Sequence, residues 1–331
     1  MEFALSEEQA QLAATVRSLL DKHADSRAVR AAAESEAGYD DALWRLLCEQ
    51  IGVAALAIPE EHDGAGFSLF ESLLVLEELG RSLAPAPLLA TLVTAEALLA
   101  GADEEAKQRL LPRIAAGEIA AFVDDISGPA LDADRATILV LASDDGLFEV
   151  DPAHAQRTWA PTMDQTIRLA SVTAGTGAAT RIAADATAAA ERARLVGAVG
   201  VAALQTGCAA RALDMTVAYT RERVQFGRPI GSFQALKHRM AEMLVEVETS
   251  RSASWAASYA VATGAANAAE LAHVAKSWCG DALAHVAAET VQLHGGIAIT
   301  WEHDAQLAFK RAHALGHLCG SAREHRAALE L

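Results

Sequence analysis

The chain has 331 residues, enough for about two domains at roughly 150 residues each. Hydrophobic residues make up 52% of the chain and charged residues 21%, a balance typical of a globular protein and not of a disordered one. Aromatic residues are only 5%, and the apolar content is mostly Ala, Leu and Val. Because Ala and straight-chain residues keep their freedom in a helix, this composition favours packed helices over a β-sandwich.

The formal net charge is −17, from 44 acidic and 27 basic residues. A field of that sign repels phosphate backbones and anionic lipid head groups, so we expect binding to neither nucleic acid nor a membrane surface. The acidic N-terminus is unlike a signal peptide. A zinc site or a disulfide framework is not expected, because four cysteines form no CxxC pair: Cys48, Cys208, Cys279 and Cys319. We expect a cytoplasmic protein with reduced thiols and no bound metal.

The N-terminal third has helical patterning. Ser6 and Gln9 have the spacing of a capping box, and apolar residues follow at helical intervals as far as Leu20. Pro and Gly residues separate the later helical segments. These are predicted at Asp41–Ile51, Phe70–Leu83, Leu88–Leu99 and Glu104–Ala116. Residues 1–118 are therefore predicted to form a helical domain.

The pattern changes to short strands after residue 118. Ala136–Leu141 and Leu147–Val150 flank the turn signal Asp144-Asp145-Gly146, which predicts a hairpin. Thr166–Val172 alternates like a further strand. The loop from Gly175 to Thr180 resembles a dinucleotide-binding turn, but no second strand of a βαβ unit follows, so we interpret it as a glycine-rich loop. Residues 119–184 are predicted to form a reduced β domain.

Helical periodicity returns near residue 185 and predicts a C-terminal four-helix bundle over residues 185–331. Its helices are expected at Arg192–Thr220, Ser232–Thr263, Ala265–Gly295 and Ala305–Leu329. The predicted fold class is thus mainly α, with a small β region between two helical parts.

Two segments of the C-terminal part are specific enough to indicate chemistry. In Tyr219–Gln234, a helix end that carries Arg221 and Arg223 is followed by a turn at Gln225-Phe226-Gly227, and Arg228 comes directly after the turn. Arginines at a helix C-terminus suit the helix dipole, yet guanidinium, aromatic and amide groups together also bind a pyrophosphate and a purine. In Thr290–Thr300, the glycine pair could simply end a helix or could let the backbone approach a ligand closely.

Four segments in order resemble the acyl-CoA dehydrogenase family over nearly the whole chain. They are Ile51–Gly66, Leu76–Arg81, Arg223–Gly227 and Gln292–Gly296. The resemblance implies an N-terminal helical domain, a middle β-barrel-like domain and a C-terminal four-helix bundle. It also implies FAD as cofactor and an acyl-CoA substrate. The residues that match the two flavin signatures of the family are Arg223, Gln225, Phe226, Gln292, Gly295 and Gly296.

The middle of the chain departs from the family pattern. The Thr-Glu-Pro…Gly-Ser-Asp and Trp-x-Thr segments, which in the family lie against the flavin of the same subunit, are absent. Instead, Ala120–Pro129 runs almost directly into Asp134–Leu139. The first half of the barrel is therefore interpreted as missing.

The family's catalytic glutamate has no counterpart either. Cys319-Gly-Ser321 occupies the place of the common Glu-Gly-Thr turn, and Gly197 lies near the alternative position of the base. A thiol, with a reference pKa of about 8.5, is a poor substitute for a carboxylate. Glu302 or His303 could be a substrate-contacting group or a displaced base, but a helix start capped by Asp304 is the favoured interpretation. Cys319 is interpreted as a small buried filler, and no residue is assigned as catalytic.

The retained motifs are those that, in the family, reach across a dimer interface to the neighbour's flavin. The chain therefore resembles shortened subunits that pair with a full-length relative in heteromeric acyl-CoA dehydrogenases of the steroid-side-chain type. This implies a full-length partner subunit, a heterotetramer and an electron-transfer flavoprotein or similar acceptor. The alternatives are a self-sufficient homo-oligomeric dehydrogenase with a displaced base and a structural paralogue without flavin contacts. Retention of the flavin motifs counts against the structural paralogue.

Overall fold

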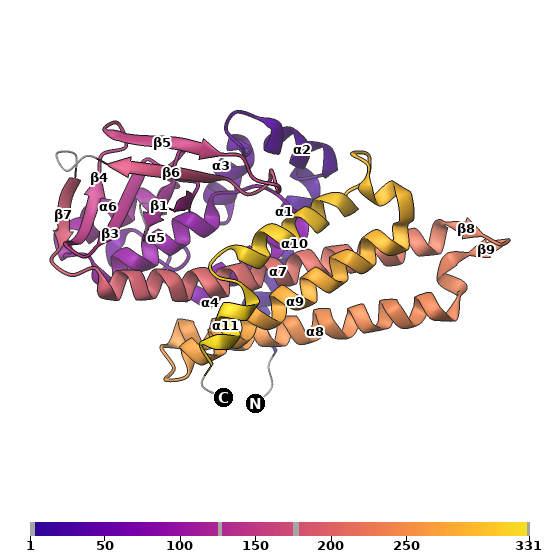
Figure 1. Ribbon diagram of the computed structural model, residues 1–331. Helices are drawn as coiled ribbons and strands as arrows, with labels where there is room; N and C mark the ends of the chain where they lie inside the picture. Colours follow the sequence, from indigo (N-terminus) through magenta and orange to yellow (C-terminus); the bar gives the residue numbers. More distant parts are fainter. Residues whose placement is uncertain (1–3, 125–127, 175–178, 330–331) are drawn as a thin grey trace. The chain divides into compact units, whose positions relative to one another are not determined.

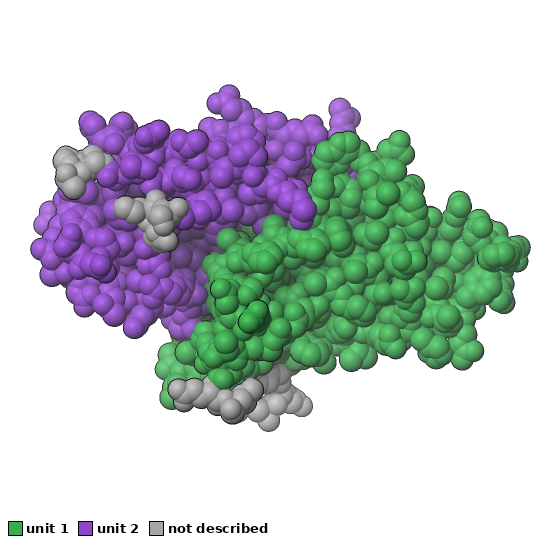
Figure 2. All heavy atoms as spheres, in the orientation of Figure 1, with its two compact units in different colours: residues 1–26, 76–84, 198–331 green, residues 27–75, 85–197 purple. Residues whose placement is uncertain are grey.

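The computed structural model describes residues 4–124, 128–174 and 179–329, and it is mainly helical (Figure 1). The chain forms two compact units (Figure 2). One comprises residues 1–26, 76–84 and 198–331, and the other comprises residues 27–75 and 85–197. The glycine-rich loop lies largely outside the described residues.

Six α-helices form the N-terminal part, and their starts follow local sequence signals. Ser6 and Gln9 make the predicted capping box at the first helix. The side chains of Asp40 and Asp103 accept backbone N–H groups at two later helix starts, where these donors have no partner within the helix. The helices are α1 (Glu7–His23), α2 (Ser26–Glu34), α3 (Asp41–Gln50), α4 (Leu69–Ser82), α5 (Leu88–Gly101) and α6 (Glu104–Ala115).

Among the described residues, seven short strands form two sheets in the unit that contains residues 85–197. One sheet has the order β1-β3-β4-β7 and the other β2-β6-β5. β1 runs parallel to β3, and the other neighbouring strands are antiparallel. The predicted hairpin is β3–β4, which is closed by a two-residue turn at Asp144 and Asp145. The strands are β1 (Ala120–Val123), β2 (Pro129–Leu131), β3 (Ile138–Ser143), β4 (Gly146–Val150), β5 (Ala155–Ala160), β6 (Leu169–Ala174) and β7 (Ala179–Ala183).

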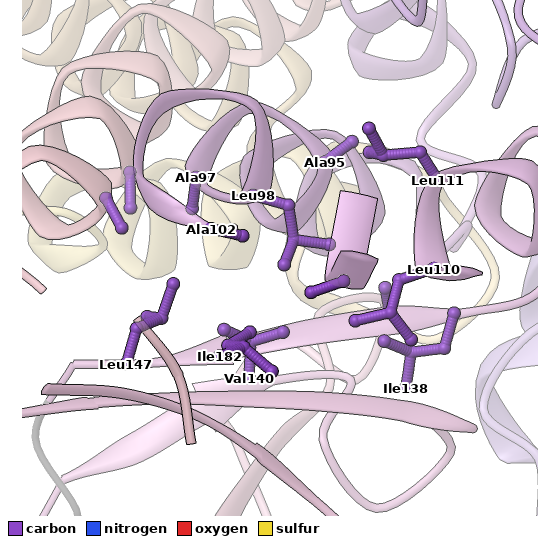
Figure 3. Packing of buried hydrophobic residues seen from close by; sticks show 14 of the residues in the cluster. Ala95, Ala97, Leu98, Ala102, Leu110, Leu111, Ile138, Val140, Leu147 and Ile182 are labelled. Atoms are coloured by element: carbon purple, nitrogen blue, oxygen red, sulfur yellow. The ribbon is translucent and has the colours of Figure 1, made fainter. Parts of the chain in front are cut away.

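The core of this unit lies between the four-stranded sheet and the helices α5 and α6. Ile138 and Val140 are two residues apart on β3, so their side chains lie on one face of the sheet, together with that of Ile182 on β7 (Figure 3). Leu98 of α5 and Leu110 of α6 cover that face from above in the view of Figure 3. All five side chains are essentially inaccessible to water, so this packing fixes the sheet against the helices.

Three long helices and two shorter ones make up the described C-terminal part. They are α7 (Thr187–Glu222), α8 (Gln234–Thr263), α9 (Ala268–His294), α10 (Ala305–His317) and α11 (Ala322–Ala327). Gly264, with φ of +64°, ends α8 in the left-handed conformation that glycine adopts without strain. In the described part of the chain, only α7 is long and apolar enough to cross a membrane, but 83% of the qualifying window is buried inside the protein. That burial is typical of the core helix of a globular protein.

The structure corrects several sequence-based boundaries. The helix predicted at Ala305–Leu329 is two helices, α10 and α11, because Cys319 and Gly320 have positive φ angles of 55° and 94°. The strand predicted from Thr166 begins only at Leu169. Helix α2 and strands β1, β2, β5 and β7 were not predicted, since each is short and is defined by its neighbours in the fold.

Candidate functional site

The arginine segment forms a tight hairpin directly after α7. Strands β8 (Val224–Gln225) and β9 (Arg228–Pro229) pair antiparallel. Phe226 and Gly227 between them both have positive φ, at 52° and 77°, as a two-residue hairpin turn of this type requires. The hairpin confirms the predicted turn at Gln225-Phe226-Gly227.

The hairpin exposes the side chains that were assigned to flavin binding. Arg223, Gln225 and Phe226 are all exposed, and Phe226 has 92% of its surface accessible. Among the described residues, no carboxylate lies within ion-pair distance of the Arg223 guanidinium. The Gln225 amide donates to the carbonyl of Val224 at 2.8 Å, so its oxygen is available to a ligand.

The double-glycine segment is equally open. Gly295 ends α9 with φ of +65° and begins the short 3₁₀ segment η3 (Gly295–Ile299). Gln292, Gly295 and Gly296 are exposed, and a Cβ atom built on either glycine would meet no other atom within 4 Å. Another molecule can therefore approach this backbone closely. Exposed guanidinium and amide donors beside bare backbone fit the pyrophosphate and ring edges of a flavin nucleotide.

Two contacts join α7 to α9 near the helix ends that carry the hairpin and the double-glycine segment. The hydroxyl groups of Thr216 and Thr290 are 3.0 Å apart. The rings of Tyr219 and His294 stack with their centroids 4.4 Å apart. Tyr219 lies four residues before Arg223, and His294 immediately precedes the glycines. Sequence reasoning gave no role to Tyr219 or His294, although both lie inside or beside the motifs.

The turn at Cys319, Gly320 and Ser321 is held through its backbone. Lys276 of α9 is completely buried, and its ammonium donates to the carbonyls of Leu315 and Gly320 at 3.2 and 2.7 Å. Burial lowers the pKa of this ammonium. Nε2–H of His325 donates to the carbonyl of Cys319 at 2.8 Å. Lys276 and His325 were not recognised from the sequence.

The side chain of Cys319 itself contributes little to this turn. The residue as a whole is exposed, whereas burial raises the pKa of its thiol to about 11, so the interpretation as a small buried filler holds for the thiol and not for the whole residue. The only carboxylate bound to the turn among the described residues is that of Glu324, which accepts the N–H and hydroxyl of Ser321 in a capping box. That carboxylate is therefore engaged at a helix start.

The polar cluster after the glycines also differs from expectation. Asp304 precedes α10, but its side chain makes no cap hydrogen bond there and instead accepts the hydroxyl of Ser26. Nδ1 of His303 accepts the N–H of Ala305 at 3.2 Å, so this histidine serves the helix start. Glu302 is exposed. Gly197 is buried within α7.

Two arginines bind the segment between β2 and β3. The Arg168 guanidinium bonds both carboxylate oxygens of Asp134 at 2.6–3.0 Å and lies 5.2 Å from the centroid of the Trp159 ring. Arg157 donates to the carbonyls of Ala133, Asp134 and Ala136. These charge-assisted hydrogen bonds tie the connection between β2 and β3 to the strands beside it.

Two family models match the chain. The acyl-CoA dehydrogenase N-terminal domain matches residues 6–118, and the acyl-CoA dehydrogenase C-terminal domain matches residues 185–329. The chain belongs to the acyl-CoA dehydrogenase family. Members of this family are oxidoreductases and flavoproteins, and the sequence-based recognition of the family is confirmed.

Individual relatives agree over nearly the full length. The acyl-CoA dehydrogenase IpdE2 of Mycolicibacterium smegmatis is 47% identical over 98% of this chain and 99% of that protein. A structure titled "Tcur3481-Tcur3483 steroid ACAD G363A variant" has a TM-score of 0.88 at 29% identity and covers 97% of this chain and 96% of that chain. The ChsE4-ChsE5 complex from Mycobacterium tuberculosis has a TM-score of 0.88 at 25% identity, over 99% and 97% of the chains. The predicted fold class, with two helical parts and a small β region, is thereby confirmed.

Proposed function

We propose that this chain is one subunit of a hetero-oligomeric acyl-CoA dehydrogenase and that it completes the flavin site of a full-length partner subunit. The complex would carry out α,β-desaturation of an acyl-CoA thioester. The observation that carries this proposal is the openness of the two flavin signatures. Both are exposed, both arise from helix ends that are joined to each other, and Arg223 has no carboxylate partner among the described residues.

Bound FAD would supply the hydride acceptor for the β-carbon of the thioester. The guanidinium of Arg223 would bind its pyrophosphate, with Gln225, Phe226 and Gln292 as neighbouring contacts. Gly295 and Gly296 would let the backbone reach the cofactor without steric conflict. The contacts usually made by the flavin's own subunit would come from the partner, since the connection around Asp134 carries none of the family's residues for them.

The partner would also supply the general base. A general base must lie within hydrogen-bond reach of the α-proton, and the resemblance to the family implies that it is a glutamate. At the turn around Cys319, the carbonyls are held by Lys276 and His325 and the nearby carboxylate of Glu324 is engaged in a helix cap. We assign no catalytic residue to this chain.

The named relatives support a heteromeric enzyme and a steroid-derived substrate class. One similar structure is described as a steroid ACAD with two proteins in its title, and another is a complex of two different chains. By that analogy, the acyl-CoA would carry a large ring-containing acyl group. An electron-transfer flavoprotein or similar acceptor would reoxidise the complex in the cytoplasm.

The test is to purify the chain alone and together with proteins encoded by the neighbouring open reading frames, and to measure the flavin-to-protein ratio and the desaturation of acyl-CoA thioesters. We expect the chain alone to carry little FAD and to be inactive, because the partner's contacts and base are missing. The right pairing should be yellow and active. A yellow, active preparation of the isolated chain would overturn the proposal and favour a homo-oligomer with Glu302 or another carboxylate as base. A stable, flavin-free pairing would favour a structural role.

A further inference from the structure

We infer that the stacked pair of Tyr219 and His294 positions the two flavin-binding segments relative to each other. The inference rests on the proposed function, because it assigns a role to residues that lie behind the surface offered to FAD. Tyr219 accepts the N–H of Arg223 through its carbonyl at 2.9 Å, so the start of the hairpin is tied to it. His294 is the last residue of α9 and is bonded covalently to Gly295.

The geometry of the stack restricts how the two helix ends can move. The ring planes of Tyr219 and His294 are inclined by only 26° at a centroid distance of 4.4 Å. The ring of His303 lies 4.5 Å from that of His294 and edge-on to Tyr219 at 6.2 Å. The three rings therefore join the ends of α7 and α9 to the start of α10.

Hydrogen bonding fixes the orientation of the His294 ring. Its Nδ1 lies 2.7 Å from the carbonyl of Thr290, which can only accept, so Nδ1 carries the proton. Nε2 of the neutral ring is then a bare acceptor, and within the described residues this buried atom has no hydrogen-bond partner. His294 is only 4% exposed. Burial lowers the pKa of His294, and the nearby His303 lowers it further.

A buried acceptor without a partner lowers stability, so a phenyl ring would serve a merely structural stack better. The imidazole offers what phenyl lacks: its Nδ1–H bond to Thr290 holds the ring at one angle against Tyr219. That angle fixes the direction in which the chain leaves α9 at Gly295. The unpartnered Nε2 atom of His294 lowers the local stability, while the fixed ring holds the two flavin-binding segments at a constant distance.

The experiment uses the complex of this chain with its partner and measures the dissociation constant for FAD, the visible circular dichroism of bound flavin and the melting temperature. Tyr219→Leu and His294→Asn each remove one ring from the stack, and His294→Asn keeps a donor that can reach Thr290. We expect each to weaken FAD binding by about tenfold, the scale of one aromatic pair, and to change the flavin dichroism. Tyr219→Phe should restore both, because it keeps the ring.

Thr216→Val is the matched control. It removes the hydroxyl pair between the same two helices from a buried position further from both segments. We expect a lower melting temperature with unchanged FAD affinity and dichroism. If the two ring-removing variants lower only the melting temperature, as Thr216→Val does, the inference is wrong. Arg223→Ala separates this outcome from failure of the proposed function: if it also leaves FAD affinity unchanged, the segment does not bind the partner's flavin at all.

Discussion

At the scale of single residues, Arg223 is the most direct test of flavin binding. Its guanidinium is exposed directly after α7 and meets no carboxylate among the residues that the structure describes. Arg223→Ala should weaken FAD retention in the complex by about 10- to 100-fold, the equivalent of a charge-assisted hydrogen bond of about 1.5–3 kcal/mol. Arg223→Lys should restore it only in part, because an ammonium lacks the planar fork.

Flavin absorbance per complex after gel filtration, together with a thermal melt, measures both effects. The competing interpretation treats Arg223 only as a charge that suits the helix dipole. It predicts full flavin content with a lowered melting temperature for Arg223→Ala, and full restoration by Lys. That result would remove the whole hairpin from the flavin site.

Cys319 gives the second prediction at this scale. The residue is exposed as a whole, although burial raises the pKa of its thiol to about 11, and the turn is held by the carbonyls of Cys319 and Gly320. Cys319→Ala keeps the backbone bonds and the Cβ atom, so the activity of the reconstituted complex should stay within about twofold of the unsubstituted one. A loss of about a hundredfold or more in turnover, typical for removal of a general base, would show that the base is in this chain after all.

At the scale of elements, small residues set how closely α4 and α7 cross. A Cβ atom on Gly207 would lie 1.8 Å from the carbonyl oxygen of Glu77, and one on Gly80 would lie 2.3 Å from that of Leu204. The same region holds Arg251 and Trp255 of α8, which both donate to the Glu77 carboxylate. The backbones of α4 and α7 are thus in contact next to the Glu77 carboxylate, which binds the Arg251 guanidinium and the Trp255 indole.

Gly207→Ala should therefore destabilise the chain, whereas Gly316→Ala should not. The added methyl group at residue 207 forces α4 and α7 apart, and overpacking of this kind costs about 1–3 kcal/mol. Gly316 lies in α10, and a Cβ atom there would meet nothing within 4 Å. Its replacement should be neutral or stabilising through helix propensity. Melting temperatures of the two variants measure this, and equal values would contradict the close crossing.

At the scale of the whole molecule, the proposed function predicts the ratio of FAD to subunits in the complex. Under the proposal, this chain supplies only the contacts to the flavin of its neighbour. It can therefore complete one flavin site on the partner, but it cannot form a flavin site of its own. We expect the purified complex to hold one FAD for each pair of unlike chains. Absorbance of released flavin against subunit amounts measures the ratio. Two flavins for each pair would mean that this chain also binds FAD through its reduced β region.

The sequence by itself determined what depends on neighbours along the chain. Ser6 with Gln9, the two-residue turn after Ser143, and Phe226-Gly227 each fix their backbone within one turn, so these starts and turns were predicted correctly. The segments proposed to bind flavin were singled out for the same reason, since glycine, proline and arginine have recognisable local roles there. Helix α2 and most of the short strands were not predicted, because the local preferences of their residues are weak.

Only the tertiary structure decided how those segments are held. The stack of Tyr219 on His294 and the hydroxyl pair of Thr216 and Thr290 join residues about 75 positions apart. The break between α10 and α11 depends on Lys276, which lies on another helix and reaches the Gly320 carbonyl from the interior. Such contacts cannot be predicted from residues that are close in sequence, because they arise from packing between elements that come together only when the chain folds.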